Sequence, residues 1–220
     1  MRVSDIRHPP AARGVARSIN PAAGLHSITA DEAELRACAR ASARSWQYFP
    51  YYEMRYGTEG SKFGFSDSAW IATLCERGAT EAVEQIRWLG GLLSSRGMPQ
   101  IMLEYHLRFQ REEMTAESGE TGRRCAVLRR CERALTALRR KVFTDSRFDR
   151  LVRSFVERAG LQQIERVGIL LVSAVADEAS GIEKAVAALS SFVCDPSRFP
   201  ASWITAAEKT IAEARASVRR

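Results

Sequence analysis

Histidine is scarce in this sequence, and the spaced residue pairs that mark common catalytic and metal sites are missing. Only His8, His26 and His106 are present, and none lies at the ExxH or HExxH spacing of di-iron and zinc sites. The five cysteines include no CxxC pair, so neither a zinc ribbon nor a thioredoxin-type site is indicated. No GxSxG segment occurs either. We therefore expect no metal site and no catalytic residue set of these kinds.

Long apolar runs are also lacking. The longest nearly apolar stretch runs only from Val167 to Ala176, whereas a helix needs about 20 residues to cross a bilayer. The N-terminal segment lacks the apolar core of a secretory signal. An odd number of widely spaced cysteines is typical of reduced thiols. We therefore expect a cytoplasmic protein without membrane insertion.

What the sequence does contain is a recurrent helical pattern from residue 30 onward. Apolar side chains return every three or four positions, and no segment alternates as a strand does. The pattern predicts an all-α, compact multi-helix bundle of about eight or nine helices, with the apolar segment Ile164 to Ala176 as its central helix. Residues 1–29 are expected to form a flexible basic tail, and residues 30–220 a single all-helical domain. A subdivision near residues 115–122 is the alternative.

Positive charge is concentrated in one predicted helix. The segment Arg123 to Lys141 carries a large excess of basic residues, whereas the rest of the chain balances to zero. At 100° per residue, a group of these side chains gathers opposite the apolar stripe: Arg123, Arg129, Arg130, Arg133, Arg140 and Lys141. Such a face can bind the phosphates of nucleic acid, because guanidinium groups match phosphate oxygens. The alternative is a solvated helix face without a ligand.

His106 is the one histidine within the helical part of the chain. The helix predicted over residues 99–114 places it on one face with Met102, Tyr105 and Phe109. A histidine among methionine and aromatic side chains can serve as an axial haem ligand, so a haem or small-molecule site is one interpretation. The alternative is a core histidine that is hydrogen-bonded to a carbonyl or a carboxylate.

Aromatic side chains gather between residues 48 and 67, where a proline and two glycines interrupt the helical pattern. We expect an ordered loop there, and loops of this length are often functional. Its candidate ligand or partner residues are Tyr51, Tyr52, Arg55, Tyr56, Lys62, Asp67 and Trp70. In the alternative interpretation, the rings only seal one end of the bundle.

Three functions are consistent with these features. The first is a non-catalytic helical regulatory or protein-interaction module of bacterial cytoplasmic type, which acts with a protein partner or as a homo-oligomer. The second is a small-molecule or haem-binding sensor domain that uses His106 and the aromatic loop 48–67. The third is nucleic-acid binding through the basic helix 123–141.

Overall fold

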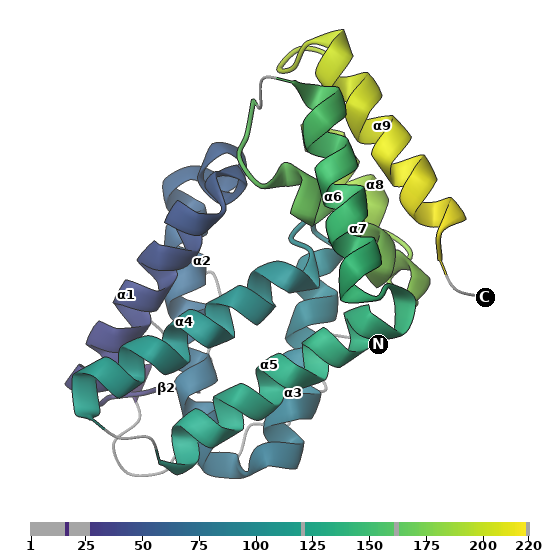
Figure 1. Ribbon diagram of the computed structural model, residues 1–220. Helices are drawn as coiled ribbons and strands as arrows, with labels where there is room; N and C mark the ends of the chain where they lie inside the picture. The colour runs from purple at the N-terminus through teal and green to yellow at the C-terminus, as the bar shows by residue number, and fades with distance from the viewer. Residues whose placement is uncertain (1–15, 18–26, 120–121, 161–162, 219–220) are drawn as a thin grey trace.

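The computed structural model describes residues 16–17, 27–119, 122–160 and 163–218, and within these ranges the chain is mostly helical (Figure 1). Nine helices are present in these ranges, which confirms the expected all-α bundle. They are α1 (Glu32–Tyr48), α2 (Pro50–Arg77), α3 (Ala79–Ser94), α4 (Gln100–Ser118), α5 (Arg123–Val142), α6 (Asp145–Ala159), α7 (Val167–Ala179), α8 (Ala185–Val193) and α9 (Ala201–Ala216). Two short strands, β1 (Ala16–Arg17) and β2 (Ser27–Ile28), pair antiparallel before α1.

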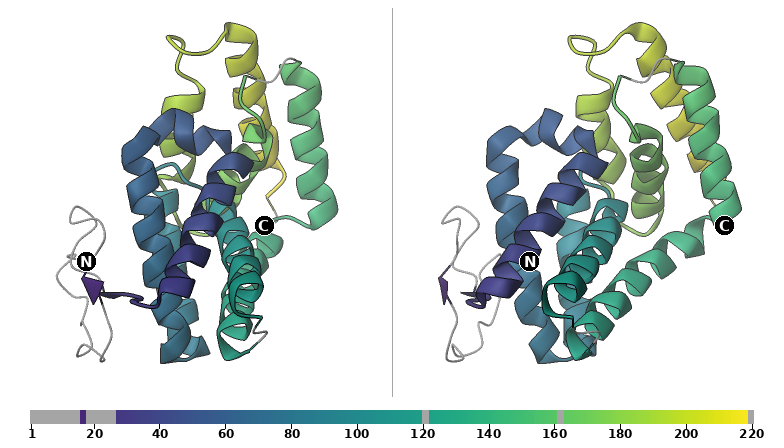
Figure 2. Two further views of the ribbon diagram at one scale, coloured as in Figure 1. Left: turned by 90° about the vertical axis from the view of Figure 1, so that its left-hand side faces the viewer. Right: turned by 60° about the vertical axis from the view of Figure 1, so that its left-hand side comes forward.

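The helices form two groups that pack side by side (Figures 1 and 2). The first group, α1 to α5, surrounds one apolar cluster, and the second group, α6 to α9, surrounds another. The groups share side chains, because Phe49, Ile101 of α4 and Val142 of α5 are buried in the second cluster. Residues 115–122, the alternative place for a subdivision, join α4 to α5 within the first group.

Helix α7 is the central helix, as its sequence predicts. Ten of its thirteen residues are buried. It contacts α6, α8 and α9 within its own group, and α3, α4 and α5 across the boundary. A helix that is apolar on nearly every side requires partners of this kind all around it. It begins at Val167, three residues later than expected from the sequence.

Residues 50–77 form one long, kinked helix, which corrects the loop expected over residues 48–67. Pro50 occupies the first turn of α2, where its missing N–H is not needed, so it begins a helix and does not interrupt one. Gly57 adopts φ 55° and ψ −151°, a conformation that favours glycine, and α2 bends at this residue. Ser66 and Asp67 therefore lie inside the second half of α2 and do not cap a helix.

Most of the expected N-terminal tail, residues 1–15 and 18–26, lies outside the described residues. Its last residues pack against α2: Ile28 is buried, and the N–H of Thr29 donates to the carbonyl of Ala69 at 3.2 Å. Helix α1 then starts with Asp31 as its N-cap, which accepts a hydrogen bond from the N–H of Glu34 at 2.9 Å. The packed part of the chain therefore begins before residue 30.

Candidate functional site

Four exposed arginines of α5 surround the small side chain of Ala126: Arg123, Arg129, Arg130 and Arg133. We call this surface the arginine face. Together with neighbouring residues of α3 and α4, these side chains enclose a hollow of about 580 Å³. None of the four forms an ion pair with a carboxylate in the described part of the chain. The arginine face is therefore a concentration of uncompensated positive charge.

The helical spacing of apolar residues that buries one side of α5 leaves the arginine face exposed on the other side. Leu128, Cys131 and Leu135 are buried against α3 and α4, so the positions half a turn away point to solvent. The N-cap residue Gly122 supplies no side-chain hydrogen bond to the first turn of α5. The N-terminal end of the α5 helix dipole adds a positive potential beside Arg123.

Two of the six predicted basic residues do not belong to this surface. Arg140 is paired with Asp145 of α6 through two hydrogen bonds of 3.0 and 2.7 Å. Lys141 is exposed at the far end of α5, outside the hollow. The structure thus brings together four of the six side chains that the helical pattern placed on one face.

Helix α4 adds one arginine that sequence reasoning missed. Arg111 lines the same hollow, together with Thr115. Its Nη2 atom lies 3.5 Å from Glu132, and its buried Nε atom has no hydrogen-bond partner. The sequence of α4 contains no signal for this role, because the packing of α4 on α5 sets it. Arg111 therefore adds a fifth guanidinium group to the lining of the hollow, and this one lies near Glu132.

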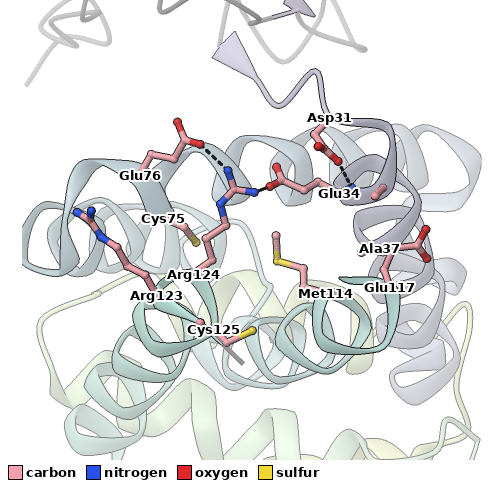
Figure 3. A pocket seen from close by; sticks show the side chains of 12 residues that line it. Asp31, Glu34, Ala37, Cys75, Glu76, Met114, Glu117, Arg123, Arg124 and Cys125 are labelled. Atoms are coloured by element: carbon pink, nitrogen blue, oxygen red, sulfur yellow. Dashed lines mark hydrogen bonds and ion pairs between the residues drawn. The ribbon is translucent and has the colours of Figure 1, made fainter. Parts of the chain in front are cut away.

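A larger pocket of about 650 Å³ adjoins the arginine face and differs from it in charge (Figure 3). Arg124 extends across this pocket and pairs with Glu34 and with Glu76, the latter at 2.6 Å. The thiols of Cys75 and Cys125 lie below this guanidinium group. Because carboxylates already neutralise Arg124, this pocket is less suited to an anion than the arginine face is.

The cysteines are free, and their surroundings disfavour nucleophilic chemistry. All but one are buried. Burial raises the pKa of Cys38 and Cys131 to about 11, and that of Cys75 to about 12. These three thiols therefore stay protonated near neutral pH. No group of three or more His, Cys, Asp or Glu side chains in the described ranges is arranged to hold a metal ion.

Three of the predicted partner residues, Tyr51, Arg55 and Tyr56, hold the fold together. The hydroxyls of Tyr51 and Tyr56 donate to carbonyls of residues 97 and 96, in the turn between α3 and α4, at 2.5 and 2.7 Å. Arg55 donates to the hydroxyl of Tyr51 at 2.5 Å and to the carbonyl of Ala188 in α8 at 2.7 Å. These residues therefore join the two helix groups, which agrees with the alternative interpretation of the aromatic segment.

Two rings expected beside a cofactor take part in packing between helices. Tyr105 stacks on Tyr48 at the end of α1, with ring centroids 4.6 Å apart. Phe109 lies beneath the guanidinium group of Arg44, at 4.5 Å from its central carbon. Both contacts join α4 to α1.

Lys62 and Trp70 also lie apart from the other predicted partner residues. Lys62 is exposed and pairs with Glu59, three residues earlier on α2, at 2.7 Å. Trp70 packs edge-on against Trp88 of α3, with ring centroids 6.4 Å apart. The predicted partner set is thus distributed along a helix and does not form one surface.

Four residues from the two predicted sets do meet in one small cavity. Tyr52 and Asp67 of α2 and Met102 and His106 of α4 line it. Its volume is about 70 Å³, whereas common small-molecule pockets begin at about 300 Å³. Haem does not fit a space of this size, so the structure offers no support for His106 as a haem ligand.

His106 belongs to a hydrogen-bond network between α1, α2 and α4. Its Nδ1 atom lies 2.9 Å from the hydroxyl of Ser45. Burial lowers the pKa of His106 to about 4, with Gln110 acting in the opposite direction, so the ring is neutral at pH 7. His106 Nε2 and Gln110 Oε1 are both buried and have no hydrogen-bond partner among the described residues. This is the environment of a core histidine.

No helix in the part of the chain that the structure describes is both long and apolar enough to cross a membrane. Comparisons with known proteins found no matching family model, no matching curated protein and no matching solved structure. The function must therefore be inferred from the sites themselves.

Proposed function

We propose that this protein is a non-catalytic helical binding module that works in the cytoplasm and binds nucleic acid through the arginine face. The uncompensated charge of Arg123, Arg129, Arg130 and Arg133 supports the choice of a polyanion. The free thiols support a reducing compartment. A regulatory role would then depend on whether nucleic acid occupies the arginine face.

The observation that carries the proposal is the contrast between this surface and the arginines elsewhere. On α1, Arg40 and Arg44 both pair with Glu113 of α4, at 2.8 and 2.7 Å. On α5 itself, Arg139 pairs with the buried Glu104 at 3.2 Å. The arginines at these helix contacts thus have carboxylate partners, and those of the arginine face have none among the described residues. Exposed arginines without a described carboxylate partner also occur on α6, at Arg150 and Arg153. The gathering of four such side chains around one hollow therefore supports the proposal more than the missing partners do.

The spacing of the arginine face suits a phosphodiester backbone. The distance along α5 from Arg123 to Arg133 is about 15 Å at 1.5 Å per residue. Duplex DNA carries one phosphate per about 1.7 Å of its axis, so several phosphates lie within reach of the four side chains. Each guanidinium group can donate two parallel hydrogen bonds to one phosphate. Because such contacts do not read bases, we expect little sequence preference.

The salt dependence of binding tests the proposal quantitatively. We expect fluorescence anisotropy with a short labelled duplex to show an affinity that falls steeply with salt. Four phosphate contacts predict a slope of about −3.6 in log K against log salt, or a roughly 150-fold loss between about 50 and 200 mM. A single strand with the same number of contacts should give a slope of about −2.8. A flat response would exclude phosphate contacts.

A matched pair of double variants locates the contact. The double variant Arg129→Glu with Arg133→Glu removes half of the arginine face. We expect the slope of log K against log salt to become shallower by about 1.8, and binding to become undetectable at moderate salt. The control combines Arg150→Glu with Arg153→Glu, which change the same charge on the exposed side of α6. Equal losses in both double variants would show that net charge alone, and not this surface, governs binding.

A protein contact is the second candidate, and one exposed tryptophan favours it. Trp88 of α3 is 37 % exposed beside Trp70, and tryptophan is enriched at the centres of protein interfaces. A homo-oligomer would bury this ring. Light scattering should then report a mass above that of the monomer, and Trp88→Ala should restore the monomer. A monomeric wild-type protein at high concentration would exclude the homo-oligomer.

A further inference from the structure

The small cavity between α1, α2, α3 and α4 has a composition that the nucleic-acid proposal does not explain. Its walls are mainly apolar and aromatic, and include Trp46 of α1, Leu93 of α3 and Met102 of α4. One ionisable carboxyl, that of Asp67, faces this space from α2. An acid in apolar surroundings is unfavourable for folding unless it is paired, so its presence requires a reason.

Two rings form one wall of the cavity, and glycines of α2 make room for them. Trp46 and Tyr52 lie parallel, with an interplanar angle of 5° and ring centroids 6.3 Å apart. A Cβ atom at Gly64 would lie 3.2 Å from the indole nitrogen of Trp46. A Cβ atom at Gly60 would lie 3.2 Å from the ring of Tyr52. The kinked helix α2 is thus shaped to let both rings approach the cavity.

Asp67 is left without a partner in this arrangement. It makes no hydrogen bond and no ion pair with any residue that the structure describes, whereas the nearby hydroxyl of Tyr52 donates to the carbonyl of Gly60 at 2.8 Å. Burial raises the pKa of Asp67 to about 7, and the positive charge of Arg96 acts in the opposite direction. A carboxyl of this kind is stabilised in its ionised form by a cation placed beside it.

We propose that this cavity binds a small organic cation of the ammonium or guanidinium type, which pairs with Asp67 and lies against the rings of Trp46 and Tyr52. Aromatic faces carry partial negative charge and attract such cations, most strongly where water is excluded. The cavity volume of about 70 Å³ equals the share of about two water molecules in the liquid. A cation of the size of methylammonium or guanidinium fits this space.

The affinity for a ligand of this size is limited. With two to four heavy atoms, even an efficient ligand reaches a dissociation constant of only about 0.1 to 10 mM. Titration of the ¹⁵N-labelled protein with methylammonium chloride, monitored through the indole resonance of Trp46, measures affinities in this range. Trp46→Phe assigns that resonance among the four tryptophans.

The Asp67→Asn variant tests the ion pair directly. We expect at least a tenfold weaker response, because the amide has nearly the same shape and no charge. The control is Asp149→Asn, which makes the same change at an exposed position of α6 and should bind as the wild type does. Ethanol, a neutral molecule of similar size, should produce no saturable shift. Equal binding by Asp67→Asn, or equal binding of ethanol, would overturn the proposal.

The pH dependence of the wild-type protein gives a second test that needs no variant. A bound cation requires the ionised carboxylate, so affinity should fall roughly 25-fold between about pH 7.5 and pH 5.5, in proportion to the ionised fraction. The other groups near this carboxyl keep their charge over the range: His106 is neutral above about pH 4, and the pKa of Tyr52 is raised above its ordinary value. A pH-independent affinity, or the absence of saturable binding, would contradict the assignment.

Discussion

Replacing Asp177 with asparagine should make the stability of the protein less sensitive to pH. This carboxyl lies in the central helix α7 and is only 5 % exposed. Its Oδ2 atom accepts hydrogen bonds from the hydroxyl of Ser94 at 2.7 Å and from the backbone N–H of Gln100 at 2.8 Å. Asp177 thus caps the start of α4 from the other helix group. No basic side chain in the described ranges pairs with it.

The size and sign of the effect follow from the pKa. Burial raises the pKa of Asp177 from 3.8 to about 7, although its two hydrogen bonds act in the opposite direction. Between these values the folded state binds more protons than the unfolded state, so the free energy of unfolding falls as pH rises. At 1.36 kcal/mol per pH unit, the full loss is about 4 kcal/mol. More than half of it falls between about pH 5 and pH 8.

Two other buried groups titrate in the same range, so a single pH profile does not isolate Asp177. Burial also raises the pKa of Asp67 to about 7, which makes stability fall with pH in the same way. The pKa of His106 is lowered to about 4, so its contribution rises with pH between about 4 and 6.5. The difference between the wild-type and Asp177→Asn profiles removes both contributions.

Urea unfolding followed by circular dichroism at several pH values measures this difference. Relative to the wild type, Asp177→Asn should gain about 2 to 3 kcal/mol between about pH 5 and pH 8, whatever its stability at the acid end. Asp149→Asn, an exposed position of α6, should follow the wild-type profile. If the Asp177→Asn and wild-type profiles run parallel, Asp177 titrates normally in the folded protein and the argument from burial is wrong.

Two further substitutions test contacts within the fold, each beside a neighbour that serves as its control. Arg139→Met should lower the free energy of unfolding by about 3 kcal/mol, because it leaves the buried Glu104 without its cation. Arg140→Met removes only an exposed pair and should leave the free energy of unfolding in chemical denaturation nearly unchanged. Gly97→Ala should lower the free energy of unfolding by about 2 kcal/mol or more. The φ angle of Gly97 is 92°, and a Cβ atom there would collide with the guanidinium group of Arg55. Gly91→Ala, in open space within α3, should raise the melting temperature slightly.

Helical periodicity predicted the parts of the fold in which the apolar side chains of a single helix determine which of its faces is buried. On α5, Leu128, Cys131 and Leu135 face the first cluster as the pattern indicates. In α7, apolar side chains on nearly every side predicted the central position correctly. Both predictions depend only on the order of side chains along one helix, and this order is fully present in the sequence.

The segment around Gly57 shows where this reasoning fails. Proline and glycine were taken to exclude a helix, but Pro50 occupies the first turn of α2 and Gly57 permits a bend. Tyr51 is buried and Arg55 is half-buried, because the turn around Gly97 and the carbonyl of Ala188 accept their hydrogen bonds. These acceptors lie far away along the chain, so no local pattern indicates them.

The candidate sites divide in the same way. The arginine face was predictable because its four α5 members share one helix and one face. Arg111 was not predictable, because only the packing of α4 on α5 brings it to the hollow. Asp67 was expected on a loop, together with Lys62, and the structure instead places it in a cavity opposite His106. Contacts between helices, which the sequence does not list, decide these cases.

An arginine-rich composition could by itself explain a basic helix, and the pairing of arginines across the fold argues against that explanation here. Between α1 and α4, Arg36, Arg40 and Arg44 follow one another at intervals of four residues and face Glu113 and Glu117, with charge-assisted hydrogen bonds of 2.5 to 2.8 Å. Such exposed pairs stabilise little one by one, but their order fixes how α1 lies along α4. Arginines placed without selection would be unpaired on both surfaces alike. They are matched between α1 and α4 and have no carboxylate partner among the described residues on the arginine face, where the proposed phosphate contacts would neutralise their charge.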